Sequence, residues 1–148
     1  MPAATNPYPA LNLDEILKKW QAAVSGGQMS AFGGLYAPNA QLRVPLSEEP
    51  IQGREAIQQY ETAISSAFPG ATLRLSESCI SGDTVAAEWE YSGMNTGPLA
   101  SPDGVLPPTN RRLSLRGASF LRCSRDGAIV EEHRYYDRTS FFQQLGLR

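Results

Sequence analysis

The side chains best suited to moving a proton stand near the end of the chain, on a segment predicted to form the last strand, residues 129–138. His133, Tyr135 and Asp137 occupy alternate positions there, so a strand would turn all three toward one side. A carboxylate in an apolar pocket suits the removal of a proton next to a carbonyl group, because desolvation raises its pKa toward the operating pH. Asp137 is therefore the candidate catalytic residue.

Each of these three residues also has a structural interpretation. Asp137 could cap the helix that follows, and the residues alone favour this cap, although Ser140 and Gln143 offer a capping box of their own. His133 lies about 13 Å from Asp137 along a strand, too far for a hydrogen bond, so we expect a structural histidine. Tyr135 could donate a phenol hydrogen bond to a substrate carbonyl, or fill the core.

Four other aromatic residues are candidate walls of a pocket for an apolar ligand: Trp20, Tyr36, Trp89 and Tyr91. Aromatic residues at such spacings more often belong to a core, and both interpretations stay open. Cys79 and Cys123 each stand alone in a strand-like segment, and the chain has a single histidine. We therefore expect buried, inert thiols, with no metal and no cofactor.

Helices that would position these side chains are predicted in the first half of the chain. Asn12 caps a first helix, whose apolar face runs from Leu13 to Val24 and which stops at Gly26-Gly27. A second, shorter helix carries Met29, Phe32, Leu35 and Tyr36, and ends before Pro38. A third helix begins at Arg54 and is closed by Pro69-Gly70.

Strands are predicted at residues 40–45, 71–78, 84–92, 112–124 and 129–138, with a closing helical turn over 139–146. In the strand at 84–92, Val85, Ala87, Trp89 and Tyr91 share one face, while Glu88 and Glu90 lie on the other. The segment GPLASPDGVLPPTN (97–110) contains too many prolines to lie inside a sheet. Helices gathered early and strands gathered late predict an α+β fold with an antiparallel sheet.

Composition limits the classes of function. The 148 residues are 41% apolar, which fits one domain over 12–148 after an irregular tail over 1–11. The formal net charge of −2 gives no basic field for nucleic acid or acidic lipid. No apolar run reaches the roughly 20 residues that span a bilayer, and the N-terminus lacks the pattern of a signal peptide. We expect a soluble, cytoplasmic protein that binds neither nucleic acid nor membrane.

Several motifs resemble a known superfamily. Residues 13–60 show a helix, Gly-Gly, a helix, LYAPNA, a strand and GREAI, in an order that resembles NTF2-like domains. Residues 93–146 carry GMNTGPL, PPTNRR and RGASFLRCSRDGAIVEEHRYYDRTSFFQQLG. This part is similar to the SnoaL-like group, which includes polyketide cyclases, with its pattern G-T-H-x-G, P-T-G-R, D-G-x-I, a strand ending in Asp, and Q-L-G.

The resemblance implies an NTF2-like cone, a curved antiparallel sheet covered by N-terminal helices, that holds a small apolar molecule. It also implies a homodimer through the outer sheet face. In the cyclases an acidic residue near the end of the final strand is the general acid/base, and the matching position is Asp137. Asn95 stands where the family often has a histidine at the pocket mouth, so a possible proton carrier is replaced by a candidate substrate-binding amide.

Two other branches of the superfamily can be compared at the matching positions. The ketosteroid isomerase branch has its general base and its oxyanion-stabilising tyrosine where this chain has Val44 and Trp20, which cannot do those jobs. The epoxide hydrolase branch needs an arginine and two aspartates that converge from the later strands. The strand at 112–124 contains no aspartate, so that triad is not evident.

Two functions follow from these observations. The first is a SnoaL-like enzyme that uses cofactor-free acid/base chemistry to cyclise or isomerise an apolar, carbonyl-bearing, polyketide-like molecule, with Asp137 as the acid/base. The second is a non-catalytic NTF2-like module that binds a ligand or a protein. The retained Asp137 favours the first, and the replaced histidine and isomerase positions favour the second.

Overall fold

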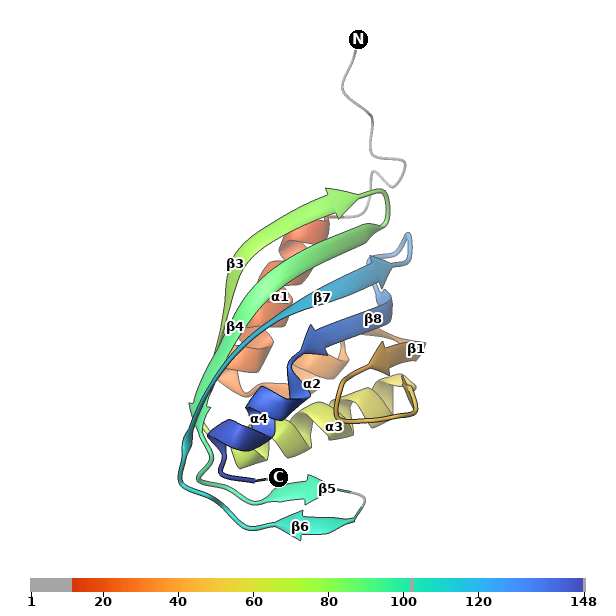
Figure 1. The fold of residues 1–148 in the computed structure, drawn as a ribbon. Helices are drawn as coiled ribbons and strands as arrows, with labels where there is room; N and C mark the ends of the chain where they lie inside the picture. Colours follow the sequence, from red (N-terminus) through yellow and green to blue (C-terminus); the bar gives the residue numbers. More distant parts are fainter. Residues whose placement is uncertain (1–11, 102, 148) are drawn as a thin grey trace.

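The structure is a computed structural model that describes residues 12–101 and 103–147, so the predicted tail over 1–11 lies outside it (Figure 1). Its elements follow one another as α1 (Leu13–Gly26), α2 (Met29–Gly33), β1 (Tyr36–Arg43), β2 (Ile51–Gln52), α3 (Arg54–Ala67), β3 (Thr72–Ser81), β4 (Thr84–Met94), β5 (Leu99–Ser101), β6 (Gly104–Leu106), β7 (Arg112–Cys123), β8 (Ile129–Tyr136) and α4 (Arg138–Gln144). In these ranges no helix is both long enough and apolar enough to cross a membrane.

A curved six-stranded sheet, in the order β2-β1-β8-β7-β4-β3, curls around the helices (Figure 1). Helix α1 packs against β3, and α3 packs against β1 and β2. All neighbouring strands are antiparallel except β1 and β8, which run parallel. The first and last long strands can pair in parallel because most of the chain separates them, so no tight turn dictates their direction. The α+β architecture predicted from the order of elements is confirmed.

The boundaries of α1 follow from its sequence as predicted. The side-chain oxygen of Asn12 accepts a hydrogen bond of 3.1 Å from the backbone N–H of Glu15, which satisfies one of the unpaired donors at the helix start. Gly27 ends the helix in the left-handed conformation, with φ of 65°. Four of the apolar residues at helical spacing are buried, namely Leu13, Ile16, Leu17 and Trp20, and Val24 is partly buried. This helix therefore presents Trp20 to the inside of the sheet.

The second helix is shorter than predicted, and the first strand is longer. Helix α2 ends at Gly33, and β1 begins at Tyr36 rather than at residue 40. Pro38 lies within this strand, in the stretch where the register of β1 against β8 is interrupted between Tyr36 and Gln41. A proline is tolerated there because it has no ladder hydrogen bond to donate. As a result Tyr36 belongs to the sheet and points into the core.

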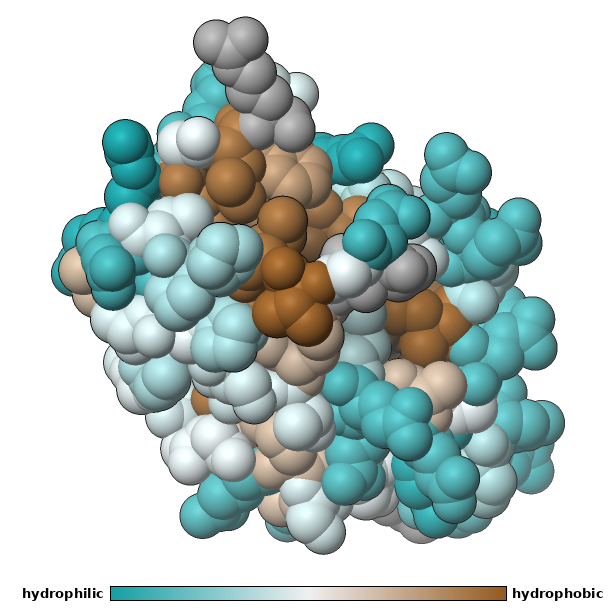
Figure 2. Space-filling view, turned by 90° about the horizontal axis from the view of Figure 1, so that it is seen from below, coloured by the Kyte–Doolittle hydropathy of each residue, from teal (hydrophilic) through white to brown (hydrophobic). Residues whose placement is uncertain are grey.

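The proline-rich segment over 97–110 stays outside the main sheet, as predicted, but it contains a hairpin of its own. Strands β5 and β6 pair over three residues each, from Leu99 opposite Leu106 to Ser101 opposite Gly104. The hairpin lies at the same end of the molecule as the C-terminus, and apolar side chains gather in a band across that end (Figure 2). Leu99 is buried there, whereas Val105 is largely exposed.

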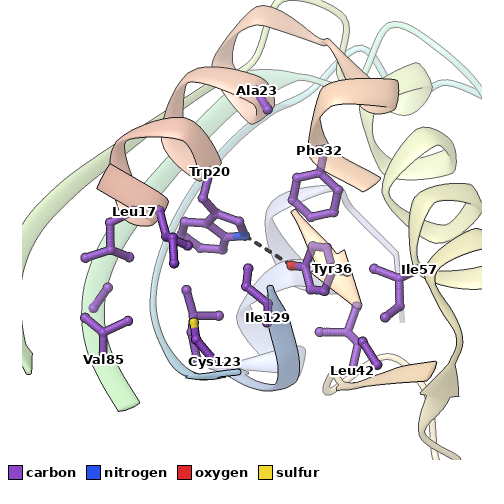
Figure 3. Close-up of a cluster of buried hydrophobic side chains, with 14 of the residues drawn as sticks. Leu17, Trp20, Ala23, Phe32, Tyr36, Leu42, Ile57, Val85, Cys123 and Ile129 are labelled. Carbon is purple, nitrogen blue, oxygen red and sulfur yellow. Dashed lines mark hydrogen bonds between the residues drawn. The ribbon is translucent and has the colours of Figure 1, made fainter. Parts of the chain in front are cut away.

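The buried apolar residues form two clusters rather than one. The first joins α1, α2, β1 and one end of the sheet, and Figure 3 shows its tightly packed centre around Trp20, Phe32 and Tyr36. The second joins the end of α3, the start of β7 and α4, around Phe68, Leu113 and Phe141. Tyr91 and Tyr136 pack against both clusters. The candidate site lies between the two clusters.

Candidate functional site

A cavity lies between the two apolar clusters, enclosed by α1, α3, α4 and strands β3, β4, β7 and β8. Its volume is about 510 Å³ when the open mouth is counted, so the enclosed part is smaller. Most of the wall is apolar, formed by Trp20, Val24, Ile64, Leu73, Trp89, Leu113, Leu115 and Phe141. Five polar side chains interrupt it: Tyr60, Glu61, Tyr91, Arg134 and Tyr136. A few polar groups in an apolar hollow are typical of a small-molecule site.

Strand β8 supplies the polar floor of this cavity through alternate residues. Glu132 has an exposed side-chain fraction of 0% and lies opposite the buried Leu121 in the register, so it faces inward. Arg134 and Tyr136 share its parity and line the cavity. His133 and Tyr135 therefore lie on the outer face of the sheet.

Arg134 is held between two carboxylates. Its Nε donates to Glu132 Oε2 at 2.9 Å and its Nη2 donates to Glu132 Oε1 at 3.4 Å. Its Nη1 donates to Glu61 Oε1 at 2.6 Å. Glu61 comes from α3, and its side chain is 5% exposed. Burial alone would lower the pKa of Arg134, but the charges of Glu132 and Glu61 outweigh burial and raise that pKa well above its ordinary value.

Glu132 accepts two further hydrogen bonds, each from a hydroxyl group. The Tyr36 hydroxyl donates to Oε1 and the Ser119 hydroxyl donates to Oε2, the latter at 3.1 Å. Each hydroxyl in turn accepts from an indole: Trp20 Nε1 lies 3.2 Å from Tyr36 Oη (Figure 3), and Trp89 Nε1 lies 3.1 Å from Ser119 Oγ. A carboxylate that accepts this many hydrogen bonds has a structural role. Glu132 anchors Arg134, and a proton acceptor for a ligand has to come from elsewhere.

Glu61 is the carboxylate that remains available. Its Oε1 accepts from Arg134, and no group in the described ranges hydrogen-bonds its other oxygen. Because no fully buried polar side-chain atom of those residues lacks a partner, this oxygen is not completely shielded, although the side chain as a whole is only 5% exposed. Glu61 lines the main cavity and also a second, adjacent hollow between the end of α1 and α3, which shares Val24 and Tyr91. The geometry therefore offers Glu61 to a molecule in the cavity.

Three tyrosines surround this carboxylate. Burial raises the pKa of Tyr60, of Tyr91 and of Tyr136, the last to about 12. Tyr60 and Tyr136 share a side-chain hydrogen bond. All three phenols therefore stay neutral at ordinary pH. Because Tyr60 and Tyr136 are hydrogen-bonded to each other, one of those two hydroxyls and Tyr91 are left to donate to an oxygen atom in the cavity.

Asp137 lies elsewhere and has the structural role that the residues alone favoured. It is the N-cap of α4, and its Oδ1 accepts from the backbone N–H of Ser140 at 3.1 Å. The residue is exposed and is not among those that line the cavity. The expected pocket position of this carboxylate is thereby corrected: β8 has ended at Tyr136, so Asp137 satisfies the first turn of the helix instead.

Tyr135 also requires a correction. It lies on the outer face, 54% exposed, with its ring 6.2 Å from that of Phe120. The shared side of His133 and Tyr135 was predicted correctly, but that side is outside. His133 Nε2 lies 3.4 Å from a Glu131 oxygen, and its Nδ1 lies 3.4 Å from the Tyr135 hydroxyl. The outward position of Glu88 and Glu90 follows the prediction, since Arg74 and Arg116 pair with Glu90 there.

Asn95 is buried, but it holds the chain together rather than facing the cavity. Its amide donates to the carbonyls of Ala67 and Gly97 at 3.1 and 3.0 Å, and its oxygen accepts from the backbone and hydroxyl of Thr109. All its hydrogen-bonding groups are thus used to join the two ends of the 97–110 segment to α3. The expectation that Asn95 contacts a ligand is corrected, because no polar atom of its side chain is left to do so.

Most of the aromatic residues predicted as cavity walls do line the cavity. Trp20, Trp89 and Tyr91 lie on the cavity wall, and Tyr36 lies behind it in the hydrogen-bond network. Their contact with a substrate stays a prediction.

The polar residues Glu61, Ser119, Glu132 and Arg134 were missed. Glu61 had a visible signal, because it stands four residues after Ile57 on the apolar face of α3. Arg134, Glu61 and Glu132 together form a group of one arginine and two carboxylates. Such a group was not evident from the strand at 112–124, because its members come from α3 and β8.

Comparison with known proteins agrees with this architecture. The model of the SnoaL-like domain matches residues 17–132. A proposed SnoaL-like polyketide cyclase from Jannaschia sp. CCS1 has a TM-score of 0.80 at 14% identity, over 100% of this chain and 99% of that one. A hypothetical protein with a ketosteroid isomerase-like fold from Catenulispora acidiphila DSM 44928, in complex with trimethylamine, has a TM-score of 0.74 at 24% identity, over 97% and 96%.

A third similar structure is that of IdmH, a proposed polyketide cyclase from Streptomyces antibioticus. It has a TM-score of 0.71 at 23% identity, over 90% of this chain and 98% of that one. No curated protein is similar enough in sequence to match the chain. At these identities the structural likeness shows the fold alone.

Proposed function

The chain belongs to the family of SnoaL-like domains, and from this premise we propose that it is a cofactor-free acid/base enzyme that cyclises or isomerises an apolar, carbonyl-bearing small molecule. Its general base would be Glu61. The observation that supports this most is that Glu61 lines an apolar cavity with one carboxylate oxygen fixed by Arg134 and the other without a hydrogen-bond partner among the described residues.

In this proposal, a proton next to the substrate carbonyl passes to Glu61, and the C–H electron pair moves onto the carbonyl oxygen as an enolate. A neutral phenol of Tyr60 or Tyr136 donates a hydrogen bond to that oxygen, which stabilises the developing charge. For isomerisation, Glu61 returns the proton to another carbon. For an aldol-type cyclisation, the enolate carbon attacks a second carbonyl, and the resulting alkoxide takes the proton from Glu61.

The remaining polar residues act on this carboxylate. Arg134 keeps Glu61 oriented, and Glu132 with its two indole–hydroxyl arms keeps Arg134 oriented. Such a fixed arrangement is useful because hydrogen bonds and charges that are already in place need no reorganisation when the proton moves.

The experiment is proton exchange in D₂O. A panel of apolar cyclic ketones and 1,3-diketones is incubated with the protein, and loss of the α-proton signal is followed by ¹H NMR. We expect accelerated exchange for at least one member, and a decrease of about 100-fold or more in Glu61→Gln. Glu55→Gln is the matched control, since Glu55 is exposed on the same helix. If no member exchanges faster, the non-catalytic binding module becomes the better description.

The Glu61–Arg134–Glu132 group favours a second candidate, opening of an epoxide by the same acid/base device. Glu61, oriented by Arg134, can take the proton of an attacking hydroxyl group or water, and the epoxide oxygen, which accepts a hydrogen bond from a neutral phenol, takes that proton from Glu61 as its C–O bond breaks. Styrene oxide and 1,2-epoxyhexane, assayed for diol formation, test it. Diol formation that disappears in Glu61→Gln, together with no ketone exchange, would favour this second reaction.

We also propose that the protein forms a homodimer through the outer face of the sheet. Phe120 and Tyr135 support this, because they are 50% and 54% exposed and their rings are in contact. Light scattering coupled to size-exclusion chromatography should give twice the monomer mass, and Phe120→Asp should return the protein to a monomer. A monomeric wild-type protein would contradict the proposal.

A further inference from the structure

The charges buried at the cavity do not cancel. Two carboxylates, Glu61 and Glu132, face one guanidinium, that of Arg134, so the group carries one formal negative charge in excess. Among the described residues that line the cavity, Arg134 is the one cation. A buried charge without a counter-charge is costly, because little water is present to solvate it. The excess charge therefore favours a cation at this position.

The excess charge is located on the Glu61 side of the group. Glu132 accepts hydrogen bonds from Arg134 Nε and from the hydroxyls of Tyr36 and Ser119, so its negative charge is compensated locally. Glu61 receives one hydrogen bond, from Arg134 Nη1. Its other oxygen has no hydrogen-bond partner among the described residues and is not completely shielded. A cation that entered the cavity would approach this oxygen, on the side away from the guanidinium.

The rest of the wall is a mixture of aromatic and aliphatic side chains, and its aromatic part suits a cation with an apolar surface. Ring contacts run without a break from Trp89 to Tyr136, Phe141, Phe68 and Tyr91, with centroids 6.0 to 6.3 Å apart. Trp20 and Tyr60 line the same space. Aromatic rings attract alkylammonium groups through their negative faces, whereas a small hydrated metal ion needs several oxygen ligands that this wall does not provide.

From the excess charge and the ring of aromatic side chains we propose that the ligand of this cavity carries a cationic amine, a protonated alkylamine or a quaternary ammonium group, placed against Glu61. This changes the substrate class of the proposed function from a purely apolar carbonyl compound to one that also carries an amine, and it rests on that function only in assigning the ligand to the same cavity. The apolar part of the ligand would occupy the space beside Leu113 and Leu115.

The test compares two probes of the same shape, choline and its uncharged carbon analogue 3,3-dimethyl-1-butanol. Both tryptophans of the chain line the cavity, so intrinsic fluorescence reports binding with no background from elsewhere. We expect a saturable change with choline at a concentration about tenfold lower than with the neutral analogue. Equal affinity for the two probes, or no saturable change with choline, would overturn the proposal, and neither result depends on a variant.

Two variants then locate the charge. Glu61→Gln should remove the preference for choline while retaining weak binding of the neutral analogue, and Glu55→Gln should leave the preference as in the wild type. A preference that survives in a folded Glu61→Gln protein would place the cation elsewhere and overturn the assignment. If that variant does not fold, the preference of the wild type for choline is measured at low and high salt. A buried pair is screened little by salt, so a preference that persists at high salt supports the assignment to Glu61, and one that disappears overturns it.

Failure of this inference and failure of the proposed function give different results. Ketone exchange that depends on Glu61, together with equal affinity for the two probes, would reject the cationic ligand and keep the enzyme. A preference for choline without any exchange would reject the proposed reaction and keep the cation-binding cavity.

Discussion

The two faces of strand β8 carry similar side chains in very different circumstances. On the outer face, Glu131 lies 3.4 Å from His133 and 3.9 Å from Arg122, and all three are partly exposed. On the inner face, Arg134 contacts Glu61 and Glu132 at 2.6 and 2.9 Å, with almost no exposure. Exposed ion pairs contribute little to stability because water and salt screen them, whereas a buried network leaves an uncompensated charge when one member is removed. The comparison shows that position relative to the sheet, not residue type, decides which charges matter.

The largest effect is expected from removing the central cation of the inner face. Arg134→Met leaves Glu61 and Glu132 buried together without a counter-charge, which should cost about 3–5 kcal/mol of unfolding free energy. Urea denaturation followed by circular dichroism measures this loss. Arg122→Met on the outer face should change stability by less than about 1 kcal/mol. Similar losses for the two variants would contradict the distinction between the faces.

The two cysteines extend the comparison to reactivity. The expectation that both thiols are buried is wrong for Cys79, which is exposed on β3. Cys123 is buried, and burial raises the pKa of its thiol from 9.0 to about 11. The reactive thiolate of Cys123 therefore forms only as the pH rises through about 11, so at pH 8 its labelling by Ellman's reagent should be about 100-fold slower than that of Cys79. Cys79→Ser and Cys123→Ser assign the fast and slow phases. A single fast phase for both thiols would show that the inner side is open to the reagent.

A smaller effect is expected where one hydroxyl supports the network. Ser119→Ala removes the donor to Glu132 and the acceptor for the Trp89 indole, which should cost about 1–3 kcal/mol. Trp89 fluorescence should change as well, since its N–H loses its partner. Unchanged stability and emission in the variant would mean that this arm does not hold Glu132 in place.

The smallest effect is expected on the outer face. In the Phe120→Asp monomer, where the proposed dimer does not cover this face, His133→Ala should alter the unfolding free energy by no more than about 0.5 kcal/mol, because the ring is partly exposed and its contact with Glu131 is long. Thermal unfolding of the variant and of its parent protein gives the value. A loss comparable with that of Ser119→Ala would contradict the assignment of His133 to the outer face.

Local patterns in the sequence predicted the elements well. The spacing of Leu13, Ile16, Leu17 and Trp20 predicts α1 and its buried face, and the alternation around Trp89 predicts the inward face of β4. These predictions succeed because the period of apolar residues is a local property. The fold class follows from the order of the elements for the same reason.

The site was harder to predict, because it depends on how distant elements meet. Alternation shows that His133 and Tyr135 share a face, but only the packing of β8 between β1 and β7 shows that this face is outside. The meeting of Glu61 with Arg134 joins residues 73 positions apart. The role of Asp137 depends on where β8 ends. Because β8 ends at Tyr136, Asp137 becomes the N-cap of α4.

The central claim is that the working carboxylate is Glu61 inside the cavity and not Asp137 at the start of α4. Ketone proton exchange in D₂O, measured side by side for the wild type, Glu61→Gln and Asp137→Asn, tests it most directly. We expect Glu61→Gln to lose exchange by about 100-fold or more and Asp137→Asn to retain it with little change in stability, because asparagine caps a helix about as well as aspartate. Exchange that is abolished in Asp137→Asn and retained in Glu61→Gln would contradict the account.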